Sequence, residues 1–540
     1  MNKEHAHLLL KNLLDRMGGE DRPRLTDLEG EAINLLLGLE HNGNDIPDFG
    51  QADPLPKNGQ KQPNVDQFIP LKLDGFDDEP VADLLMCLDF GTSFSKAFAI
   101  QDQVSGPMLI DLPIGQGEVG RERFFAAADI LIDEGKVFFG TNAAERVGTN
   151  SIDRLIQSPK QLFTMSEDAT TLRNETLNDR QDPAQLFSIR DIIVLYLSYL
   201  NFVAERELSK SAQSLNVSRR FTHPAWKKDF RERNKDEMST MMAEAIILSR
   251  NLSDRLVSGL DATVAASMLK QVRALEPEQL PTQLVAGSVR EATAAGAGAL
   301  LETDVGVRQG YLIVDVGAGT TDIAGFVVIH RSDTGELKVV EIEEAAVAIR
   351  WAGNLLDQYL SKFILLKAGF SDGSAEAQAL ENRLRKERRS VKETLFNEQS
   401  AIISLPNDTD LKVDLDEFLA TNEVRGFSEK LQVTVAQAFD AMGMFANKLL
   451  IVATGGGASL PMVQDLSKIA INTSLHGKIV LKRRAAMSEA LAAEYPELED
   501  VYPQLAVAIG GALPELPEER SINSAPGEDR GPLVIAPNYR

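Results

Sequence analysis

Two short stretches of the chain carry the residue types that hold a phosphate group and a metal ion. In the first, Asp89 ends an apolar run, and Gly91, Thr92 and Ser93 follow before a second apolar run begins. A glycine lets the backbone approach a ligand closely, and successive N–H groups of a tight turn form a concavity that binds anions. Lys96 adds a positive charge suited to phosphate, and Asp89 could hold Mg²⁺ through its water molecules. A plain hairpin with a polar turn is the alternative.

The second stretch repeats this arrangement. Asp315 ends another apolar run, and Gly317, Gly319, Thr320 and Thr321 come before the chain resumes as an apolar run. One turn of this kind is a weak signal, but two in one chain predict a pair that wraps both sides of a polyphosphate. The aspartates of the two turns would then serve a single Mg²⁺ ion.

A third glycine-rich turn comes later in the chain. Residues 451–461 read IVATGGGASLP, which predicts a strand, a turn at Gly455, Gly456 and Gly457, and a helix. Glycines there would allow a flat group to lie against the backbone, and a helix N-terminus favours anions. The chain contains no G-x-x-x-x-G-K-[ST] motif, so these turns are not those of a P-loop protein.

The segments around these turns alternate between strand and helix patterns. We expect a hairpin over 128–140 with its turn at Asp133–Gly135, and a helix over 189–208. We also expect a strand–turn–strand unit over 311–329 and a strand–turn–helix unit over 449–470. This alternation predicts an α/β fold with helices flanking sheets.

In this order, the three turns resemble the two phosphate motifs and the adenosine motif of the actin/heat-shock chaperone/sugar kinase ATPase superfamily. The chain is most similar to the nucleotide-binding domain of DnaK-type chaperones, over residues 83–513. Further segments that resemble this domain are SPKQLF, RRFTHPAW, REATAAGAGAL, AGNLLDQYL and LAVAIGGAL. The resemblance implies a two-lobed actin-like ATPase fold, in which duplicated ribonuclease H-like domains enclose ATP and Mg²⁺.

The resemblance also implies roles for individual residues. Lys160 and Glu291 would position the attacking water, Asp322 would support it, and Asp89 and Asp315 would hold Mg²⁺; Asp315 would thereby also act in catalysis. The residues expected to bind the nucleotide are Asp89, Gly91, Thr92, Ser93, Phe94, Lys96, Gly317, Gly319, Thr320, Thr321, Gly353, Lys392, Gly455, Gly456 and Gly457.

The chain departs from the chaperone pattern at several of these segments. Ala292 stands where the chaperones have a proline. In the segment that resembles their adenosine pocket, Arg389 replaces a glutamate, whereas Lys392 is retained. Ser459 replaces an arginine that packs on adenine. The resemblance therefore leaves open whether the pocket selects adenine.

Composition restricts the classes of partner. The 540-residue chain has a net charge of −24, which disfavours nucleic acid and anionic membranes as general partners. Its single cysteine, Cys87, cannot form an internal disulfide and fits a reducing, cytoplasmic setting. The sequence shows no secretory-signal pattern and no apolar run long enough for a membrane span. Two basic stretches, 219–235 and 383–392, are interpreted as solvated faces, with docking of an acidic partner as the alternative.

We expect five segments along the chain: a helical hairpin at 1–39, a linker at 40–82, ATPase lobes at 83–300 and 301–513, and a tail at 514–540. Nothing after residue 513 resembles a substrate-binding domain. The expected function is therefore slow ATP hydrolysis that switches an interaction with a protein partner, for which the N-terminal hairpin and the tail are the candidate contacts. The alternatives are a catalytically weak nucleotide-binding scaffold, an actin-like filament protein and a small-molecule kinase.

Overall fold

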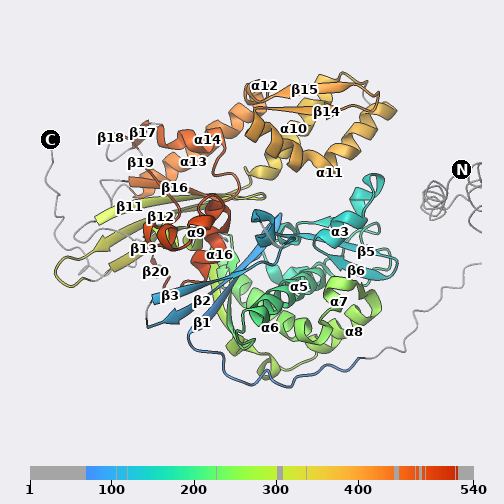
Figure 1. Cartoon of the computed structure of the whole chain (residues 1–540), viewed down its shortest axis with the longest axis vertical. Coiled ribbons are helices and arrows are strands. Elements are labelled where there is room, and N and C mark those ends of the chain that lie inside the picture. Colours follow the sequence, from blue (N-terminus) through green and yellow to red (C-terminus); the bar gives the residue numbers. More distant parts are fainter. Residues whose placement is uncertain are drawn as a thin grey trace, which may run out of the picture. The chain divides into compact units, whose positions relative to one another are not determined.

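The structure, a computed structural model, describes residues 69–520 with short gaps. Helices and strands alternate through this part of the chain, which confirms the α/β class predicted from the sequence (Figure 1). The predicted hairpin at 1–39, the linker up to residue 68 and the tail beyond residue 520 lie outside the described residues. The gaps inside the range are 105, 118–119, 225, 227, 301–307, 336, 372, 443–448, 469, 474–476, 481 and 517.

The first half of the described chain is built on a mixed sheet with the strand order β10-β8-β1-β2-β3. β1, β2 and β3 form an antiparallel meander, and β8 and β10 continue the sheet in parallel on the β1 side. The strands are β1 (Leu84–Asp89), β2 (Phe94–Gln103), β3 (Gly106–Leu112), β8 (Ser218–His223) and β10 (Val285–Arg290), with the two-residue β4 (Ala126–Ala127) paired to β2.

The second half repeats this strand arrangement. Its sheet has the order β19-β16-β11-β12-β13-β20, in which β11, β12 and β13 form the meander and β16 and β19 continue it in parallel. β20 falls in the segment 514–540 that the sequence predicted as a tail, and it adds a parallel strand to the edge of β13. The strands are β11 (Arg308–Val316), β12 (Thr321–His330), β13 (Leu337–Ile349), β16 (Leu449–Thr454), β19 (Lys482–Arg484) and β20 (Glu518–Arg520).

The two meanders also match in register at their turns. Asp89 at the end of β1 pairs with Lys96 of β2, and Asp315 of β11 pairs with Asp322 of β12. The spacing along the chain is the same in both pairs. The two turns therefore occupy equivalent positions in two sheets of the same connectivity.

Smaller elements complete the first half. The predicted hairpin over 128–140 is present as β5 and β6, within a small sheet of order β7-β5-β6-β9. Its strands are β5 (Asp129–Asp133), β6 (Lys136–Phe139), β7 (Ile156–Gln157) and β9 (Leu260–Asp261). The helices are α3 (Thr141–Arg146), α4 (Pro159–Met165), α5 (Ile189–Lys210), α6 (Arg231–Leu252), α7 (Arg255–Ser258), α8 (Ala262–Arg273) and α9 (Glu291–Leu300).

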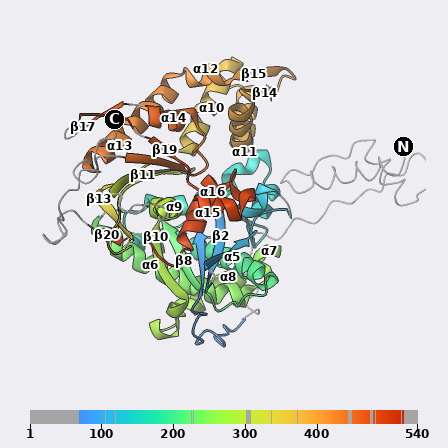
Figure 2. The ribbon, with the colours of Figure 1, turned by 60° about the vertical axis from the view of Figure 1, so that its left-hand side comes forward.

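The second half carries its own helices and two small hairpins. Figure 2 shows α10, α11 and α12 grouped with β14 and β15, away from α5 and α8. The helices are α10 (Gly353–Ala368), α11 (Ala375–Glu398), α12 (Leu415–Leu419), α13 (Asn422–Met442), α14 (Pro461–Gln464), α15 (Glu489–Glu494) and α16 (Tyr502–Gly511). The hairpin strands are β14 (Ser400–Ser404), β15 (Asp410–Asp414), β17 (Ala470–Thr473) and β18 (Gly477–Val480). The 3₁₀ turns of both halves span Arg121–Phe124, Thr149–Arg154, Ala169–Arg173, Lys228–Phe230, Pro277–Gln279, Thr282–Leu284, Asp465–Lys468 and Pro496–Leu498.

The last part of the predicted linker, residues 69–82, lies along the first half. Gln271 of α8 and Asn251 of α6 hydrogen-bond to its backbone. Phe76 is buried in the core of the first half. Side-chain contacts therefore fix the course of this stretch over the surface.

No helix in the described part of the chain is both long enough and apolar enough to cross a membrane.

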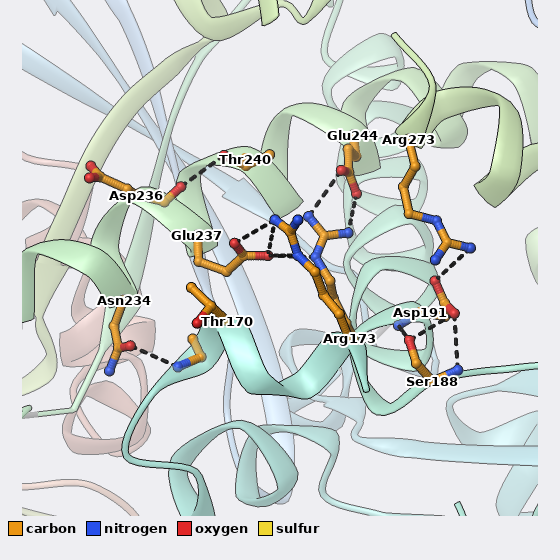
Figure 3. Close-up of polar contacts among 12 residues, drawn as sticks. Thr170, Arg173, Ser188, Asp191, Asn234, Asp236, Glu237, Thr240, Glu244 and Arg273 are labelled. Carbon is orange, nitrogen blue, oxygen red and sulfur yellow. Dashed lines mark hydrogen bonds and ion pairs between the residues drawn. The ribbon is translucent and has the colours of Figure 1, made fainter. Parts of the chain in front are cut away.

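α5 and α6 support the first sheet through a buried ionic network. Arg190 of α5, whose side chain is only 1% exposed, donates to Glu237 at 2.5 Å and to Glu244 at 2.6 and 2.9 Å. Arg173 adds a second donor to Glu237, as Figure 3 shows. Because buried charges are costly unless they are paired, this network fixes how α5 sits against α6.

Two helices rich in small residues join the halves. α9 leads from the first sheet toward the second, and α16 crosses it so closely that a Cβ on Gly510 would lie 1.8 Å from the carbonyl oxygen of Ala294. The buried side chains around this crossing come from both sheets and include Phe98 of β2 and Ile313 of β11. Figures 1 and 2 both show α9 and α16 between the two sheets. The crossing therefore sets the position of one sheet relative to the other.

Removing Arg190 would leave the carboxylates of Glu237 and Glu244 buried without their main cation. We expect Arg190→Ala to lower the free energy of unfolding by about 3–5 kcal/mol, measured as a shift of the urea midpoint. The matched control is Lys412→Ala, which breaks an exposed ion pair with Asp414 and should leave the midpoint nearly unchanged. Equal shifts in the two variants would contradict a stabilising role for the buried network.

Candidate functional site

The two equivalent turns both line one cavity of about 120 Å³. Most of the residues singled out in the sequence line it, although they come from five separate segments of the chain. They are Asp89, Gly91, Thr92, Ser93, Phe94, Lys96, Lys160, Glu291, Asp315, Gly317, Gly319, Thr320, Gly455 and Gly456. The structure therefore brings fourteen of the predicted site residues together.

Asp89 lies at the end of β1 and is held by two donors. Lys96 Nζ is 2.7 Å from one carboxylate oxygen, and Thr222 Oγ1 donates to the other at 3.0 Å. Burial acts to raise the pKa of Asp89, but the ammonium groups of Lys96 and Lys160 keep that pKa below its ordinary value. Asp89 is therefore an ionised carboxylate on the first wall.

Asp315 occupies the equivalent position on β11 in a different electrostatic setting. Thr454 Oγ1 donates to it at 3.1 Å, just as Thr222 does to Asp89. Burial and the nearby carboxylates of Asp322 and Asp89 raise the pKa of Asp315 to about 7. This carboxyl group is therefore poised between its two charge states, and a cation placed beside it would favour the ionised form.

Lys160 and Glu291 form a buried ion pair on the floor of the cavity. Lys160 projects from α4, and Glu291 is the first residue of α9. Their Nζ and Oε1 atoms lie 2.5 Å apart, and the side chains are 5% and 9% exposed. Burial, opposed by Lys160 and reinforced by Asp322 and Asp89, raises the pKa of Glu291 to about 8. A carboxyl group with a pKa in this range can both accept and release a proton near neutral pH.

The two turns approach each other closely at a glycine of the second turn. A Cβ on Gly319 of the second turn would lie 2.8 Å from the side chain of Thr92 in the first. Gly455 has a φ of 80°, and a Cβ there would lie 2.4 Å from Oδ1 of Asp315. Glycine is therefore required at Gly455 both by the backbone conformation and by the aspartate beside it.

Five predicted site residues do not line the cavity: Thr321, Asp322, Gly353, Lys392 and Gly457. Asp322 lies close behind it, because Thr320 Oγ1 donates to the Asp322 carboxylate at 2.7 Å. Thr321 Oγ1 donates to the carbonyl oxygen of Trp351 at 2.6 Å. These two residues anchor the second turn from behind.

The remaining three also face the backbone of the second half. Gly353 N–H donates to the Gly317 carbonyl at 3.1 Å, and Gly457 N–H donates to the Val316 carbonyl at 2.9 Å. Lys392 Nζ donates to the Gly353 carbonyl at 3.1 Å and lies 2.7 Å from the Asp357 carboxylate. The ammonium group of Lys392 is thus already engaged within the protein.

Sequence reasoning missed several residues of the site. Thr222 is the next-to-last residue of β8 and Thr454 the last residue of β16, and these strands lie next to β1 and β11. The sequence does show a threonine near the end of each of these apolar runs. To predict that it contacts an aspartate, however, one must know which strands are neighbours in the sheet. The cavity lining also includes Phe125, Ala318, Gln504 and Val507.

The basic stretch 219–235 is not a uniformly solvated face. Arg219 is fully buried and donates to Glu205 and Asn201. Arg220 donates to the carbonyl oxygens of Gly511, the last residue of α16, and of Leu513. Arg233, by contrast, is exposed and pairs with Asp168. The first part of this stretch therefore stabilises the interior, and the prediction of a solvated face is wrong there.

The donor set of the cavity suits a cation only together with an anionic ligand. Within the described ranges, no three His, Cys, Asp or Glu side chains converge as a metal site. Asp89 and Asp315 supply two carboxylates, so phosphate oxygens and water would have to complete the shell of Mg²⁺, as is usual for this ion. The residues present therefore fit Mg²⁺ carried by a polyphosphate better than a free metal ion.

Neither a comparison with models of protein families nor a search of curated proteins finds a match for this chain.

The raised pKa of Asp315 leads to a prediction about stability in the absence of metal. A carboxyl group with a pKa of about 7 in the folded protein binds a proton there more readily than in the unfolded chain. The free energy of unfolding therefore falls as the pH rises from about 4 to about 7. In EDTA at pH 8, we expect Asp315→Asn to be more stable than the parent by on the order of 1–3 kcal/mol, and the gain should shrink at pH 5.

The matched control is Asp102→Asn, an exposed aspartate on β2. Its urea midpoint should follow that of the parent at both pH values. A loss of stability in Asp315→Asn at pH 8 would show that the carboxylate is well compensated and would contradict the proposed charge repulsion.

Proposed function

We propose that the chain is a heat-shock-chaperone-like ATPase that binds MgATP between two lobes and hydrolyses it slowly to switch a protein–protein interaction. The observation that carries this proposal is the pair of equivalent turns, preceded by Asp89 and Asp315, that line one cavity together. A duplicated carboxylate–glycine–hydroxyl turn is suited to hold a polyphosphate from both sides.

The strand order supports the fold that the resemblance implies. Both sheets consist of an antiparallel meander followed by two parallel strands on the same side. The helices α9 and α16 lie between them. This duplication is what we expect of a two-lobed actin-like ATPase with ribonuclease H-like domains, and the order of the three glycine turns agrees with it.

The binding step would rest on backbone donors and two cations. N–H groups of the turns that contain Gly91 and Gly317 would bind phosphate oxygens, with the hydroxyls of Thr92 and Thr320 beside them. Lys96 and Lys160 would offset the phosphate charge. Mg²⁺, when bound with the nucleotide, neutralises charge that develops on the phosphates during transfer.

The hydrolytic step would rest on the buried pair at the floor of the cavity. Glu291, in the ionised form that Lys160 stabilises, would accept a proton from a water molecule, and Lys160 would hold the Glu291 carboxylate in place. The oxygen of that water would bond to the terminal phosphorus as the bond from this phosphorus to ADP breaks. Asp322 would contribute by raising the pKa of Glu291. No protein group forms a covalent bond to the phosphate in this mechanism, which rests on positioning and charge neutralisation.

The output of the cycle would be contact with a protein partner. Nucleotide shifts an equilibrium between two states only by its different affinity for them, so the partner must contact a surface that changes as the lobes close. The segment 1–39 is the proposed contact. A pull-down from native lysate with ATP or ADP, using the parent and Asp315→Asn, tests this contact. A set of partners that changes with neither nucleotide nor variant would favour the alternative of a nucleotide-binding scaffold. Filaments seen by electron microscopy would favour the actin-like alternative.

MgATP should stabilise the protein by linkage. At a concentration one hundred times the Kd, we expect a gain of about 2.7 kcal/mol, seen as a raised melting temperature. Binding should also change tryptophan fluorescence, because both tryptophans lie next to residues that hold the site. Trp226 stacks on His223, the neighbour of Thr222, and the main-chain carbonyl of Trp351 accepts a hydrogen bond from Thr321. Asp102→Asn should retain the shift. A parent protein whose melting temperature is unchanged in millimolar MgATP and MgADP would contradict the proposal.

Lys160 and Glu291 should matter more for hydrolysis than for binding. We expect Lys160→Ala and Glu291→Ala to slow phosphate release by about 10²-fold or more, while MgATP still raises the melting temperature of each variant. Steady-state phosphate release with purified protein measures the first effect. Rates equal to that of the parent would remove both residues from the mechanism.

A further inference from the structure

The first half contains a cavity that the proposed function does not use, which we call the side cavity. It has a volume of about 180 Å³ and is lined by the loop after β3, by β4 and β6, and by the helices α3, α5 and α7. Figure 1 shows β6, α3, α5 and α7 together on one side of the first half. None of the residues that line the side cavity lines the phosphate cavity. A ligand held there would therefore be bound by its own set of side chains.

Tyr199 of α5 brings an unpaired hydroxyl group to the side cavity. Its ring packs against Phe139, with the ring centres 5.5 Å apart, and the residue is only 9% exposed. The hydroxyl makes no hydrogen bond to any residue in the described part of the chain, yet it is open to the cavity. A Cβ at Gly140, whose φ is 65°, would lie 2.6 Å from this hydroxyl oxygen. Buried tyrosine hydroxyls usually have a partner, so a ligand in the side cavity would supply the missing one.

Arg206 lies further along the same face of α5. Spacings of four and three residues place Tyr199, Val203 and Arg206 in one row on the helix. Within the described ranges Arg206 donates no hydrogen bond, and its ion-pair partner Glu207, 3.5 Å from Nε, accepts two hydrogen bonds of 2.9 Å from Lys210. The Arg206 charge also opposes the rise that burial causes in the pKa of Tyr199, because the two groups are close. The terminal nitrogens of Arg206 are thus open to an anion near the Tyr199 hydroxyl.

The charge of the side cavity is positive. Of the described residues that line it, Arg206 alone is charged. In a chain with a net charge of −24, this cavity attracts anions locally. A guanidinium group binds a carboxylate through two parallel hydrogen bonds, which fix its orientation. The polar groups of the cavity therefore suit a carboxylate.

Much of the remaining lining is apolar. The aliphatic and aromatic residues are Ile114, Ala126, Phe139, Val203 and Val257. Gln116, Thr141 and Asn142 are polar, but the Asn142 amide is already bonded to the Val257 carbonyl and to Arg146. Such walls disfavour a strongly hydrated anion such as phosphate. Pockets for drug-sized molecules have volumes of about 300–1,000 Å³, so the side cavity would take a smaller ligand.

We propose that the side cavity binds a small monocarboxylate with an apolar body, such as an aromatic or branched-chain acid. The Arg206 guanidinium would pair with the carboxylate, and the Tyr199 hydroxyl would donate a hydrogen bond to it. The apolar body would lie against Phe139 and Val203. This site is built from residues outside the phosphate cavity, so the inference does not rest on the proposed function.

A fluorine NMR titration with 4-fluorobenzoate tests the site, and the neutral 4-fluorobenzamide is the matched probe. We expect the acid to bind to the parent with a Kd on the order of 1 mM, which suits a ligand of this size. The loss of a charge-assisted hydrogen bond should weaken binding by about tenfold or more, both for the amide and for the acid in Arg206→Ala. Tyr199→Phe, which removes one hydroxyl and keeps the ring, should weaken the acid by about three- to tenfold.

The matched control is Lys270→Ala, which removes an exposed cation on α8 that does not line the side cavity. It should bind 4-fluorobenzoate as the parent does. Melting temperatures close to that of the parent would show that the variants fold.

The other outcomes contradict the inference in distinct ways. Equal binding of the acid and the amide would show that no anion is recognised. An unchanged fluorine signal of the acid with the parent protein would overturn the site, and so would unchanged binding in both Arg206→Ala and Tyr199→Phe. Displacement of the acid by MgATP would place it in the phosphate cavity instead. A protein that binds 4-fluorobenzoate as expected but does not bind MgATP would contradict the proposed function and leave the side cavity as a ligand site.

Discussion

The close crossing of α9 and α16 is the constraint on which the rest of the structure depends. The carbonyl oxygen of Ala294 occupies the space that a side chain at Gly510 would need. Because the helices approach so closely, residues of both sheets share one hydrophobic cluster around them. This shared core holds the two sheets so that the turns beside Asp89 and Asp315 line one cavity. A bulkier pair of helices would separate the two walls of the cavity.

Bringing the carboxylates of the site together in the protein interior costs electrostatic free energy. Asp315, Asp322, Glu291 and Asp89 lie near one another in a buried region, and only Lys96 and Lys160 offset them within the lining. Like charges at short range disfavour ionisation, which explains the raised pKa values of Asp315 and Glu291. The hydrogen bonds from Thr222 and Thr454 and the rigid strands behind them keep these groups in place. The folded protein thus keeps an arrangement that a cation would relieve.

The sequence predicted what is local and missed what depends on neighbours in space. The apolar runs and glycines around Asp89 and Asp315 identify two strand–turn–strand units, because a hairpin is encoded by adjacent residues. Thr222 and Thr454 were missed, since their role follows from the lateral order of strands, which sequence periodicity does not encode. Lys392 was expected to face a ligand, but the partner that engages it, Asp357, lies on another helix. The roles inferred from resemblance remain predictions.

The two turns match in register but differ in the residue that pairs with the aspartate. Where the first turn places Lys96 opposite its aspartate, the second places Asp322. The two turns therefore differ in charge at corresponding points, because Lys96 lines the cavity whereas Asp322 lies close behind the second turn. A symmetric pair of walls would accept a chain of phosphates equally well in either direction. The pair of turns is therefore not symmetric in charge, and we expect a ligand with two different ends to lie between them in one direction.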